Sequence, residues 1–318
     1  MFRSLSRREF LVTSAGVVAV TPMARRLLAQ GSAAPQTPAA PPWTAVYAPV
    51  RRNVSSFTAR GGTIGFLVND AGVIVVDSQY PDSARAFLDG LGSRTNHRPV
   101  DVLLNTHHHA DHTGGNVAFK GVAKTIVAQA RVPALQKEAE AQRQAANPAT
   151  PPVEQAYADA TFEDIWNHGV GDEMVRARKF TPAHTGGDIV VFFEKANVVH
   201  VGDLVWNGLQ TFVDRPGGAS AVNWIPVCEQ VAKTYPKDAV YLCGHANTRA
   251  GLGITIGQAE VLAMRDYMTA LVDHVRKAIA RGDAREAIVS STATLPGFET
   301  RGPLTRRALE GTYDELAK

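Results

Sequence analysis

The stretch that decides the fold is residues 106–112, which read Thr-His-His-His-Ala-Asp-His. Four histidines fall within six residues here, against ten in the whole chain of 318 residues. An apolar run at 100–104 comes just before the stretch and predicts a buried strand. The polar residues therefore follow the carboxyl end of a strand, and Gly114-Gly115 behind them allow the backbone to turn tightly.

The spacing of these side chains suits metal binding. In an extended segment, side chains two residues apart share a face of the chain. His107 and His109 can therefore bind one ion, while His108 points away from it. Asp111 and His112 lie in the turn that follows and can reach a second position.

A helical metal motif is excluded. His108 and His112 are four residues apart, as the two histidines of a His-Glu-x-x-His protease helix would be. That motif requires glutamate directly after its first histidine, and position 109 is histidine.

Four further motifs accompany this cluster in order along the chain. They are Asp77 at the end of an apolar run, Ala-His-Thr-Gly-Gly-Asp at 183–188, Val-Gly-Asp at 201–203 and Gly-His at 244–245. Together with residues 106–112, they resemble the metal-binding pattern of the metallo-β-lactamase superfamily. The resemblance covers residues 53–250.

The resemblance implies ligands for two metal ions. His107, His109 and His184 would bind the first ion, Asp111, His112 and His245 the second, and Asp203 would bridge them, with Asp77 supporting the site from below. Zinc favours imidazole and carboxylate ligands. Di-iron members of the superfamily carry glutamate at the position of His109, so the pattern favours two zinc ions over iron or manganese.

The resemblance also implies hydrolysis. A metal ion lowers the pKa of bound water and polarises a carbonyl group. We expect a metal-bridged hydroxide to attack the carbonyl of a small ester, lactone, thioester or lactam, with Asp111 and Asp203 as catalytic residues. Two alternatives stay open: a β-lactamase proper that hydrolyses antibiotics, and a non-hydrolytic metal-binding or redox accessory protein. Lactam-specialised relatives carry cysteine or serine at the position of Asp203, which favours the ester and lactone substrates.

The remaining sequence pattern predicts an α/β fold. Early strands flank a hairpin turn at 69–72, and strand and helix signals then alternate along the chain. Strands are predicted over 64–68, 73–77, 100–104, 125–127, 173–180, 189–193, 198–201 and 239–242, and helices over 81–91, 129–146, 221–235 and 258–281. With the resemblance, this order predicts the αββα sandwich of the metallo-β-lactamase fold, in which two mixed sheets lie between helical layers.

The first 30 residues predict export. Ser-Arg-Arg-Glu-Phe-Leu at 6–11 resembles the twin-arginine signal, and the apolar run behind it is shorter than the roughly 20 residues that span a bilayer. We expect a signal peptide over 1–30, a Pro/Ala-rich linker over 31–42, and a metallo-β-lactamase-like domain with a C-terminal helical tail over 43–318. The twin-arginine export machinery would then be a partner. The mature chain would be periplasmic or secreted, without stable membrane insertion.

Charge and cysteine content exclude other classes of protein. The formal net charge is +3, and the leader's five arginines and one glutamate account for four positive charges, which leaves −1 for residues 43–318. A nearly neutral domain gives no support for nucleic-acid binding, so the expected partner is a small-molecule substrate. Two cysteines, Cys228 and Cys243, are too few for a disulfide scaffold, and whether they pair stays open.

Three other features have two interpretations each. Trp206 either lines the rim of the expected substrate pocket or packs in the core. His200 is a core residue or braces the bridging aspartate from behind. The helix over 129–146 carries charged side chains, among them Glu140 and Arg143, that form a solvated face, and the segment where it ends could also serve as a lid.

Overall fold

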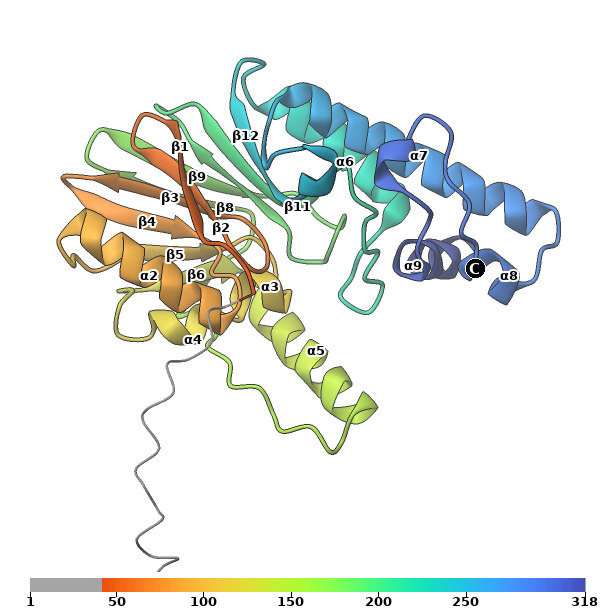
Figure 1. Ribbon diagram of the computed structural model, residues 1–318, viewed down its shortest axis with the longest axis horizontal. Coiled ribbons are helices and arrows are strands. Elements are labelled where there is room, and N and C mark those ends of the chain that lie inside the picture. The colour runs from red at the N-terminus through yellow and green to blue at the C-terminus, as the bar shows by residue number, and fades with distance from the viewer. Residues whose placement is uncertain (1–41, 318) are drawn as a thin grey trace, which may run out of the picture. The chain divides into compact units, whose positions relative to one another are not determined.

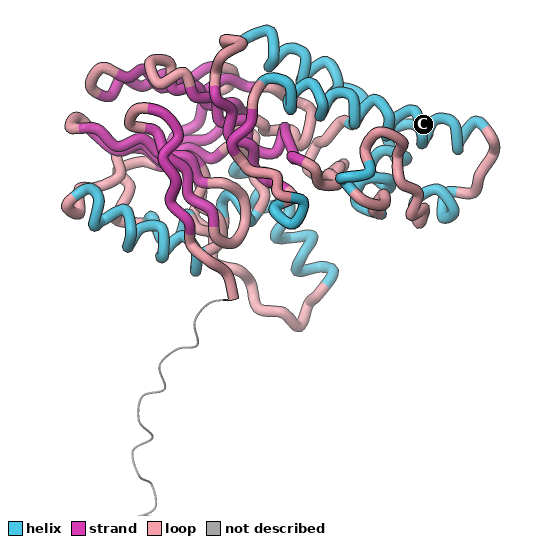
Figure 2. The backbone as a smooth tube through the Cα atoms, turned by 45° about the horizontal axis from the view of Figure 1, so that its top comes forward, coloured by secondary structure: helices cyan, strands magenta, loops and turns pink. Residues whose placement is uncertain are grey.

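Two β-sheets packed face to face form the centre of the computed structural model (Figure 1, Figure 2). The structure describes residues 42–317, so the predicted signal peptide and all but the last residue of the predicted linker lie outside it. Helices cover the outer face of each sheet, and the layers run helix, sheet, sheet, helix (Figure 1). The predicted αββα sandwich is confirmed.

The first sheet has seven strands and is mixed. Its spatial order follows the chain: β1 (Val46–Arg51), β2 (Val54–Thr58), β3 (Ile64–Asn69), β4 (Gly72–Val76), β5 (Val102–Asn105), β6 (Ile126–Gln129) and β7 (Ala160–Phe162). Neighbours pair antiparallel from β1 to β4 and parallel from β4 to β7. Asn69 stabilises the predicted β3–β4 hairpin, because its Oδ1 accepts hydrogen bonds from the amides of Ala71 and Gly72 at 2.9 Å.

The second sheet has six strands, in the spatial order β13, β12, β11, β10, β9, β8. Their bounds are β8 (Ile165–Val170), β9 (Glu173–Lys179), β10 (Ile189–Phe193), β11 (Val198–Asn207), β12 (Val240–Ala246) and β13 (Thr255–Ile256). β11 is longer than the predicted 198–201, because the strand continues beyond an irregularity at Gly202, whose φ of 50° lies in the left-handed region. Asp203 was predicted to follow this strand, but it lies within it.

Helices close both outer faces of the sandwich. α2 (Pro81–Thr95) and α4 (Asn116–Phe119) cover the first sheet, and α6 (Ala221–Thr234) and α7 (Gln258–Ala280) cover the second (Figure 1). Phe87 of α2 lies in one buried apolar cluster with the first sheet, and Trp224 of α6 lies in another with Val199 of β11. A third cluster, which includes Leu104 and Val191, fills the space between the sheets. The core is therefore divided among three interfaces.

Helix ends follow from the local sequence. α2 begins at Pro81, whose ring presets a helical φ. α6 begins after Ser220, whose hydroxyl accepts a hydrogen bond from the amide of Asn223 at 3.0 Å. The helix predicted over 129–146 begins later, as α5 (Val132–Ala146), because β6 extends to residue 129.

The predicted helical tail consists of α7 followed by two shorter helices. These are α8 (Arg285–Val289) and α9 (Arg306–Leu316), with the 3-10 helix η2 (Glu299–Arg301) between them in the chain. A second 3-10 helix, η1 (Thr248–Ala250), follows β12. α9 packs against α6 and α7, and its Ala308 is buried in the same cluster as Trp224. Cys228 and Cys243 are buried free thiols. Among residues 42–317, no helix is both long and apolar enough to cross a membrane.

Candidate metal centre

The histidine loop, residues 106–109, follows β5, and the carboxylate of Asp77 holds it in place. β4 and β5 run parallel, with Val76 opposite Leu104, so Asp77 and Thr106 emerge at the same edge of the first sheet. The Asp77 carboxylate accepts hydrogen bonds from the amide of Thr106 at 2.7 Å and from its hydroxyl at 2.8 Å. Oδ2 of Asp77 also accepts one from Nδ1 of His112 at 2.7 Å. This carboxylate therefore fixes both the loop and one imidazole ring.

Two glycines let the second sheet bring its side chains to this loop. Asp203 lies in β11 and His245 in β12, which are parallel neighbours. A Cβ on Gly244 would overlap Oδ1 of Asp203, and a Cβ on Gly202 would lie 2.9 Å from Oγ1 of Thr106. Gly202 therefore permits the close approach of the two sheets at this edge, and Gly244 leaves room within the second sheet for the carboxylate of Asp203.

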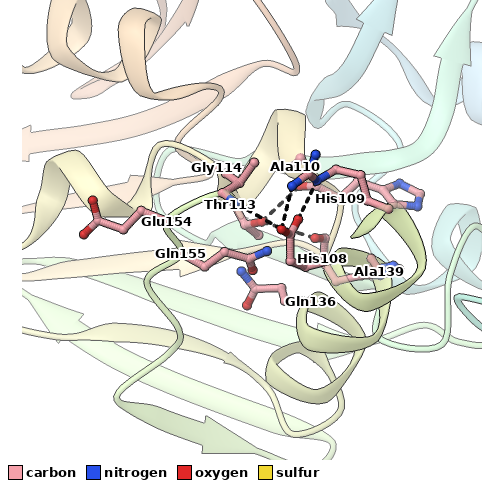
Figure 3. A pocket seen from close by; sticks show the side chains of 12 residues that line it. His108, His109, Ala110, Thr113, Gly114, Gln136, Ala139, Glu154 and Gln155 are labelled. Carbon is pink, nitrogen blue, oxygen red and sulfur yellow. Dashed lines mark hydrogen bonds and ion pairs between the residues drawn. The ribbon is translucent and has the colours of Figure 1, made fainter. Parts of the chain in front are cut away.

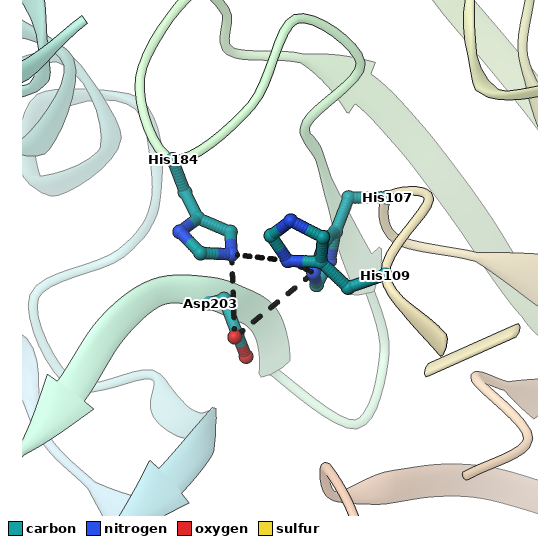
Figure 4. A group of neighbouring side chains, drawn as sticks. All are labelled: His107, His109, His184 and Asp203. Atoms are coloured by element: carbon teal, nitrogen blue, oxygen red, sulfur yellow. Dashed lines mark hydrogen bonds and ion pairs between the residues drawn. The ribbon is translucent and has the colours of Figure 1, made fainter. Parts of the chain in front are cut away.

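The first group of side chains is His107, His109, His184 and Asp203, whose candidate ligand atoms all lie within 4.8 Å of one another (Figure 4). Nε2 of His107 lies 3.1 Å from Nδ1 of His109, and Nε2 of His184 lies 2.9 Å from the same atom. Oδ2 of Asp203 lies 3.4 Å from Nε2 of His184. Three segments that are distant in sequence thus direct three ring nitrogens and one oxygen to a common point.

The second group is Asp111, His112 and His245. Asp111 is the second residue of the short helix α3 (Ala110–Thr113). Its Oδ2 lies 3.0 Å from Nε2 of His245 and 3.7 Å from Nε2 of His112. Asp203 reaches this group too, because its Oδ1 lies 3.0 Å from Nε2 of His112 and its Oδ2 lies 3.3 Å from Nε2 of His245. The structure therefore brings together all seven predicted ligands, with Asp203 between the two groups.

The polar atoms of this cluster fit divalent metal ions. Nε2 of His112, Nε2 of His245 and Oδ1 of Asp203 are buried and lie close to opposite charges, but none makes a well-directed hydrogen bond within the described part of the chain. Leaving a buried polar atom unpaired costs about 1–3 kcal/mol. Imidazole nitrogens and carboxylate oxygens are donors that zinc and other divalent ions bind. The seven side chains therefore form a His/Asp metal-binding cluster.

The two groups differ in charge. Burial lowers the pKa of His107 well below its usual value and that of His184 to about 3, so both rings are neutral. Burial also opposes protonation of His112 and His245, but neighbouring carboxylates, Asp203 foremost, outweigh it. They raise the pKa of His112 well above its usual value and that of His245 to about 9. The second group therefore attracts positive charge, which a metal ion supplies.

Two of the predicted ligands are oriented by Phe212 and Asp214, and the sequence analysis gave neither residue this role. Nδ1 of His184 donates a hydrogen bond to the carbonyl oxygen of Phe212 at 3.1 Å, and Nε2 of His109 donates one to Oδ2 of Asp214 at 2.9 Å. Burial raises the pKa of Asp214, but hydrogen bonds from neighbouring histidine rings outweigh this effect and hold it well below its usual value. Asp-Arg-Pro-Gly at 214–217 is typical of a turn, so the sequence carries no signal for this role.

His200 and Trp206 each had two interpretations, and the structure distinguishes between them. His200 is a buried core residue that contacts the carbonyl oxygen of Thr63 and the amide of Gly202, so it holds the irregular part of β11 and does not itself brace the bridging carboxylate. The ring of Trp206 lies 4.5 Å from the ring of His245, centroid to centroid. Trp206 also packs against the buried apolar cluster under α6, so it is a partly buried core residue that contacts one of the predicted ligands.

A pocket of about 270 Å³ opens beside the metal centre, between the histidine loop and α5 (Figure 3). His108 and His109 line it from the loop, and Gln136 lines it from the helix. Nδ1 of His108 and Oε1 of Gln136 are buried and lack a hydrogen-bond partner among the described residues. Nε2 of His108 lies 3.4 Å from Oδ2 of Asp214, and His108 belongs to neither of the two ligand groups described above.

The segment that follows α5 forms another wall of this pocket. Glu140 and Arg143 pair at 2.7 Å, Arg143 donates to the carbonyl oxygen of Pro151 at 2.8 Å, and Glu140 accepts from the amide of Val153 at 3.0 Å. Lys137 and Glu138 of the predicted solvated face are exposed as expected, whereas Glu140 and Arg143 depart from that prediction. Both are partly buried, and they fasten segment 147–159 to the helix.

Comparison with known proteins gives a family. The family model of the metallo-beta-lactamase superfamily matches residues 57–245, which contain all seven predicted ligands and Asp77. The metallo-beta-lactamase type 2 of Elizabethkingia meningoseptica is 25% identical over 182 residues, which are 57% of this chain and 67% of that protein. A hydroxyacylglutathione hydrolase of Chelativorans sp. is 26% identical over 207 residues, which are 62% of this chain and 68% of that protein.

Among solved structures, the stereoselective inverting sec-alkylsulfatase of Pseudomonas sp. superimposes with a TM-score of 0.61 at 18% identity. The match covers 85% of this chain and 50% of the alkylsulfatase, and at this identity the likeness concerns the fold alone. Because the family model spans more than half of the sequence, the chain belongs to the metallo-β-lactamase superfamily.

Proposed function

We propose that this chain is an exported hydrolase with two zinc ions, which cleaves a small ester, lactone, thioester or lactam at its carbonyl group. The observation that carries the proposal is the pair of ligand groups that share Asp203. Each group combines imidazole nitrogens with a carboxylate, as zinc hydrolases do. Two of the relatives are named as a metallo-beta-lactamase and a hydroxyacylglutathione hydrolase, which supports hydrolysis of a small molecule.

Zinc ions bound in this cluster would lower the pKa of bound water and polarise the substrate carbonyl. The two carboxylates differ in their access to substrate. The side chain of Asp203 is 2% exposed, so substrate cannot reach it, and its proposed role is to bind both metal ions. The side chain of Asp111 is 23% exposed, so substrate and solvent reach it. A carboxylate at this partly exposed position could accept a proton from the attacking water and return it to the leaving group.

The surroundings of the centre favour a small uncharged substrate. Trp206 and Phe212 place aromatic rings against the ligand rings. In the adjoining pocket, Nε2 of His108 faces the carboxylate of Asp214, so Nδ1 of this ring is left as an acceptor. Together with Oε1 of Gln136, it would accept hydrogen bonds from a hydroxyl or amide group of the substrate.

A β-lactamase proper is the second candidate, and the relative from Elizabethkingia meningoseptica favours it. Asp203 argues for esters and lactones instead. An alkoxide or thiolate leaves readily, whereas a lactam nitrogen must leave as an anion or be protonated, and the negative charge of Asp203 disfavours that anion. Ring strain in the lactam offsets part of this handicap. We therefore expect weak lactam hydrolysis beside faster ester or lactone cleavage.

Export is proposed from the sequence of the leader. The arginine pair at 7–8 is followed by Glu-Phe-Leu and then by a short apolar run, and these residues lie outside the part of the chain that the structure describes. Twin-arginine systems export folded proteins, so the metals would be loaded before export. A preloaded metal centre and such a leader are consistent with each other.

A substrate panel tests the proposed activity. The purified mature chain, loaded with zinc, would be assayed with aryl esters, lactones, thioesters, cephalosporins and carbapenems. We expect the highest kcat/KM for an ester or lactone. Carbapenem hydrolysis that exceeds every ester and lactone would make the chain a β-lactamase proper, and absence of turnover across the panel would favour the accessory-protein alternative.

A further inference from the structure

The C-terminal tail reaches the metal centre through the loop between β11 and α6. Segment Phe212–Asp214 of this loop contacts the outer nitrogens of two ligands, His184 through the Phe212 carbonyl and His109 through the Asp214 carboxylate. The rings of Phe212 and His109 also stack, with centroids 5.5 Å apart and an interplanar angle of 27°. The position of this segment therefore sets the direction of both imidazole rings.

α9 packs directly on the same segment. The amide of Val213 donates a hydrogen bond to the carbonyl oxygen of Arg307 at 3.2 Å, and the guanidinium of Arg307 lies 4.1 Å from the centre of the Phe212 ring. Gly311, one turn further along α9, is buried. A Cβ there would overlap the carbonyl oxygen of Val213 and lie 2.8 Å from its side chain. The helix and the segment are therefore in contact with no space between them.

The tail also fixes both ends of this loop. Arg301 donates hydrogen bonds to the carbonyl oxygens of Trp206, at 2.8 Å, and of Leu209. Burial lowers the pKa of Arg301 to about 10, so the guanidinium stays charged at neutral pH. At the other end, Glu315 of α9 accepts a hydrogen bond from the hydroxyl of Ser220, which caps α6. Contacts at both ends and in the middle hold the loop against the metal centre.

We propose that the C-terminal helices position the first metal site, by holding Phe212–Asp214 so that His109 presents Nδ1, and His184 presents Nε2, to the ion. The inference rests on the proposed function, since it assumes that the cluster binds metal. Arg307 and Gly311 are positioning residues in this account. Within the described chain, segment 212–214 makes hydrogen bonds to two ligands of the first group, His109 and His184, and to no ligand of the second group. A shift of the segment should therefore weaken binding of the first ion only.

The selectivity follows from the chemistry of imidazole. A neutral ring carries a proton on one nitrogen and a lone pair on the other, and an acceptor beside one nitrogen determines which is which. A shift of the segment would move the acceptors of two rings at once. Loss of such an outer hydrogen bond weakens metal binding about 10–100-fold.

Zinc titration of full-length variants tests this proposal. Metal-free wild type, Arg307→Ala, Gly311→Ala and Arg306→Ala would each be titrated in competition with a chromogenic chelator, which gives two stepwise dissociation constants. His107→Ala and His245→Ala assign the steps to the first and second groups. Arg306 is the matched control, because this neighbouring arginine of α9 pairs with Glu286 and Glu310 instead.

We expect Gly311→Ala to weaken the first ion about 10–100-fold. Arg307→Ala, which loses one exposed cation–π contact, should weaken it about 2–5-fold. The second ion should change less than twofold in both variants, and Arg306→Ala should match wild type at both sites. Unchanged binding of the first ion, or equal weakening of both ions, would show that the tail does not position the site. Wild type that binds no zinc would instead refute the proposed function itself.

Discussion

Asp203 is the residue on which the substrate assignment depends most. Replacing it with serine removes one negative charge between the two ligand groups, so the departure of a lactam nitrogen becomes less unfavourable relative to that of an alkoxide. We expect Asp203→Ser to raise the lactam-to-ester ratio of kcat/KM, even if both rates fall. The ratio is the quantity to measure, because metal loss lowers both reactions together. An unchanged or lower ratio would contradict this interpretation of Asp203.

Asp77 acts on the metals through another ring. Its Oδ2 holds Nδ1 of His112, which leaves Nε2 of that ring for the second group. Asp77→Asn should weaken the second ion about 10–100-fold and the first ion less, as measured by zinc titration. Asp101→Asn is the control, because Asp101 bonds Lys124 and the amide of Val73 away from the centre. Equal effects of the two substitutions would count against the assigned role.

The sequence predicts the ligands better than the residues that support them. Metal binding demands particular residue types at short, fixed spacings, so His107 and its neighbours stand out in the sequence. Asp214 and Arg307 do not, because each acts through a contact formed only when distant segments pack together. A turn residue and an exposed helical arginine have no sequence pattern that indicates such a role.

At the scale of elements, long periodic segments were predictable, whereas short strands such as β1, β2 and β8 were not. The strand over 189–193 and the helix over 258–281 agree with β10 and α7 within one residue. β1 was missed, because its six residues include Pro49 and it lies at an edge of its sheet. The end of β11 was missed because the irregularity at Gly202 interrupts the apolar run.

Packing between elements predicts a specific role for Gly244 of β12. In Gly244→Ala, the new Cβ would overlap Oδ1 of Asp203, so the carboxylate or the strand must shift. We expect loss of both metal ions, together with destabilisation of about 1–3 kcal/mol from overpacking. Metal analysis and chemical denaturation measure these effects. Gly253→Ala is the control, since a Cβ at Gly253 would come no closer than 3.9 Å to its neighbours, and both variants behaving alike would argue against the packing explanation.

At the scale of the whole molecule, the positive charge is concentrated in the leader and the domain is nearly neutral. Replacing both Arg7 and Arg8 with lysine keeps this charge but removes the planar guanidinium groups that the export receptor would recognise by hydrogen bonds. We expect the precursor to remain in the cytoplasm, as followed by cell fractionation. Periplasmic accumulation equal to wild type would rule out twin-arginine export.

The most direct test of the central claim is the metal content of the purified mature chain, measured together with its hydrolytic activity. Two groups that share Asp203 predict two zinc ions per chain. A strong chelator should abolish hydrolysis, and added zinc should restore it in proportion to occupancy. Hydrolysis that survives complete removal of metal, or a chain that holds a single iron ion and hydrolyses nothing, would contradict the account.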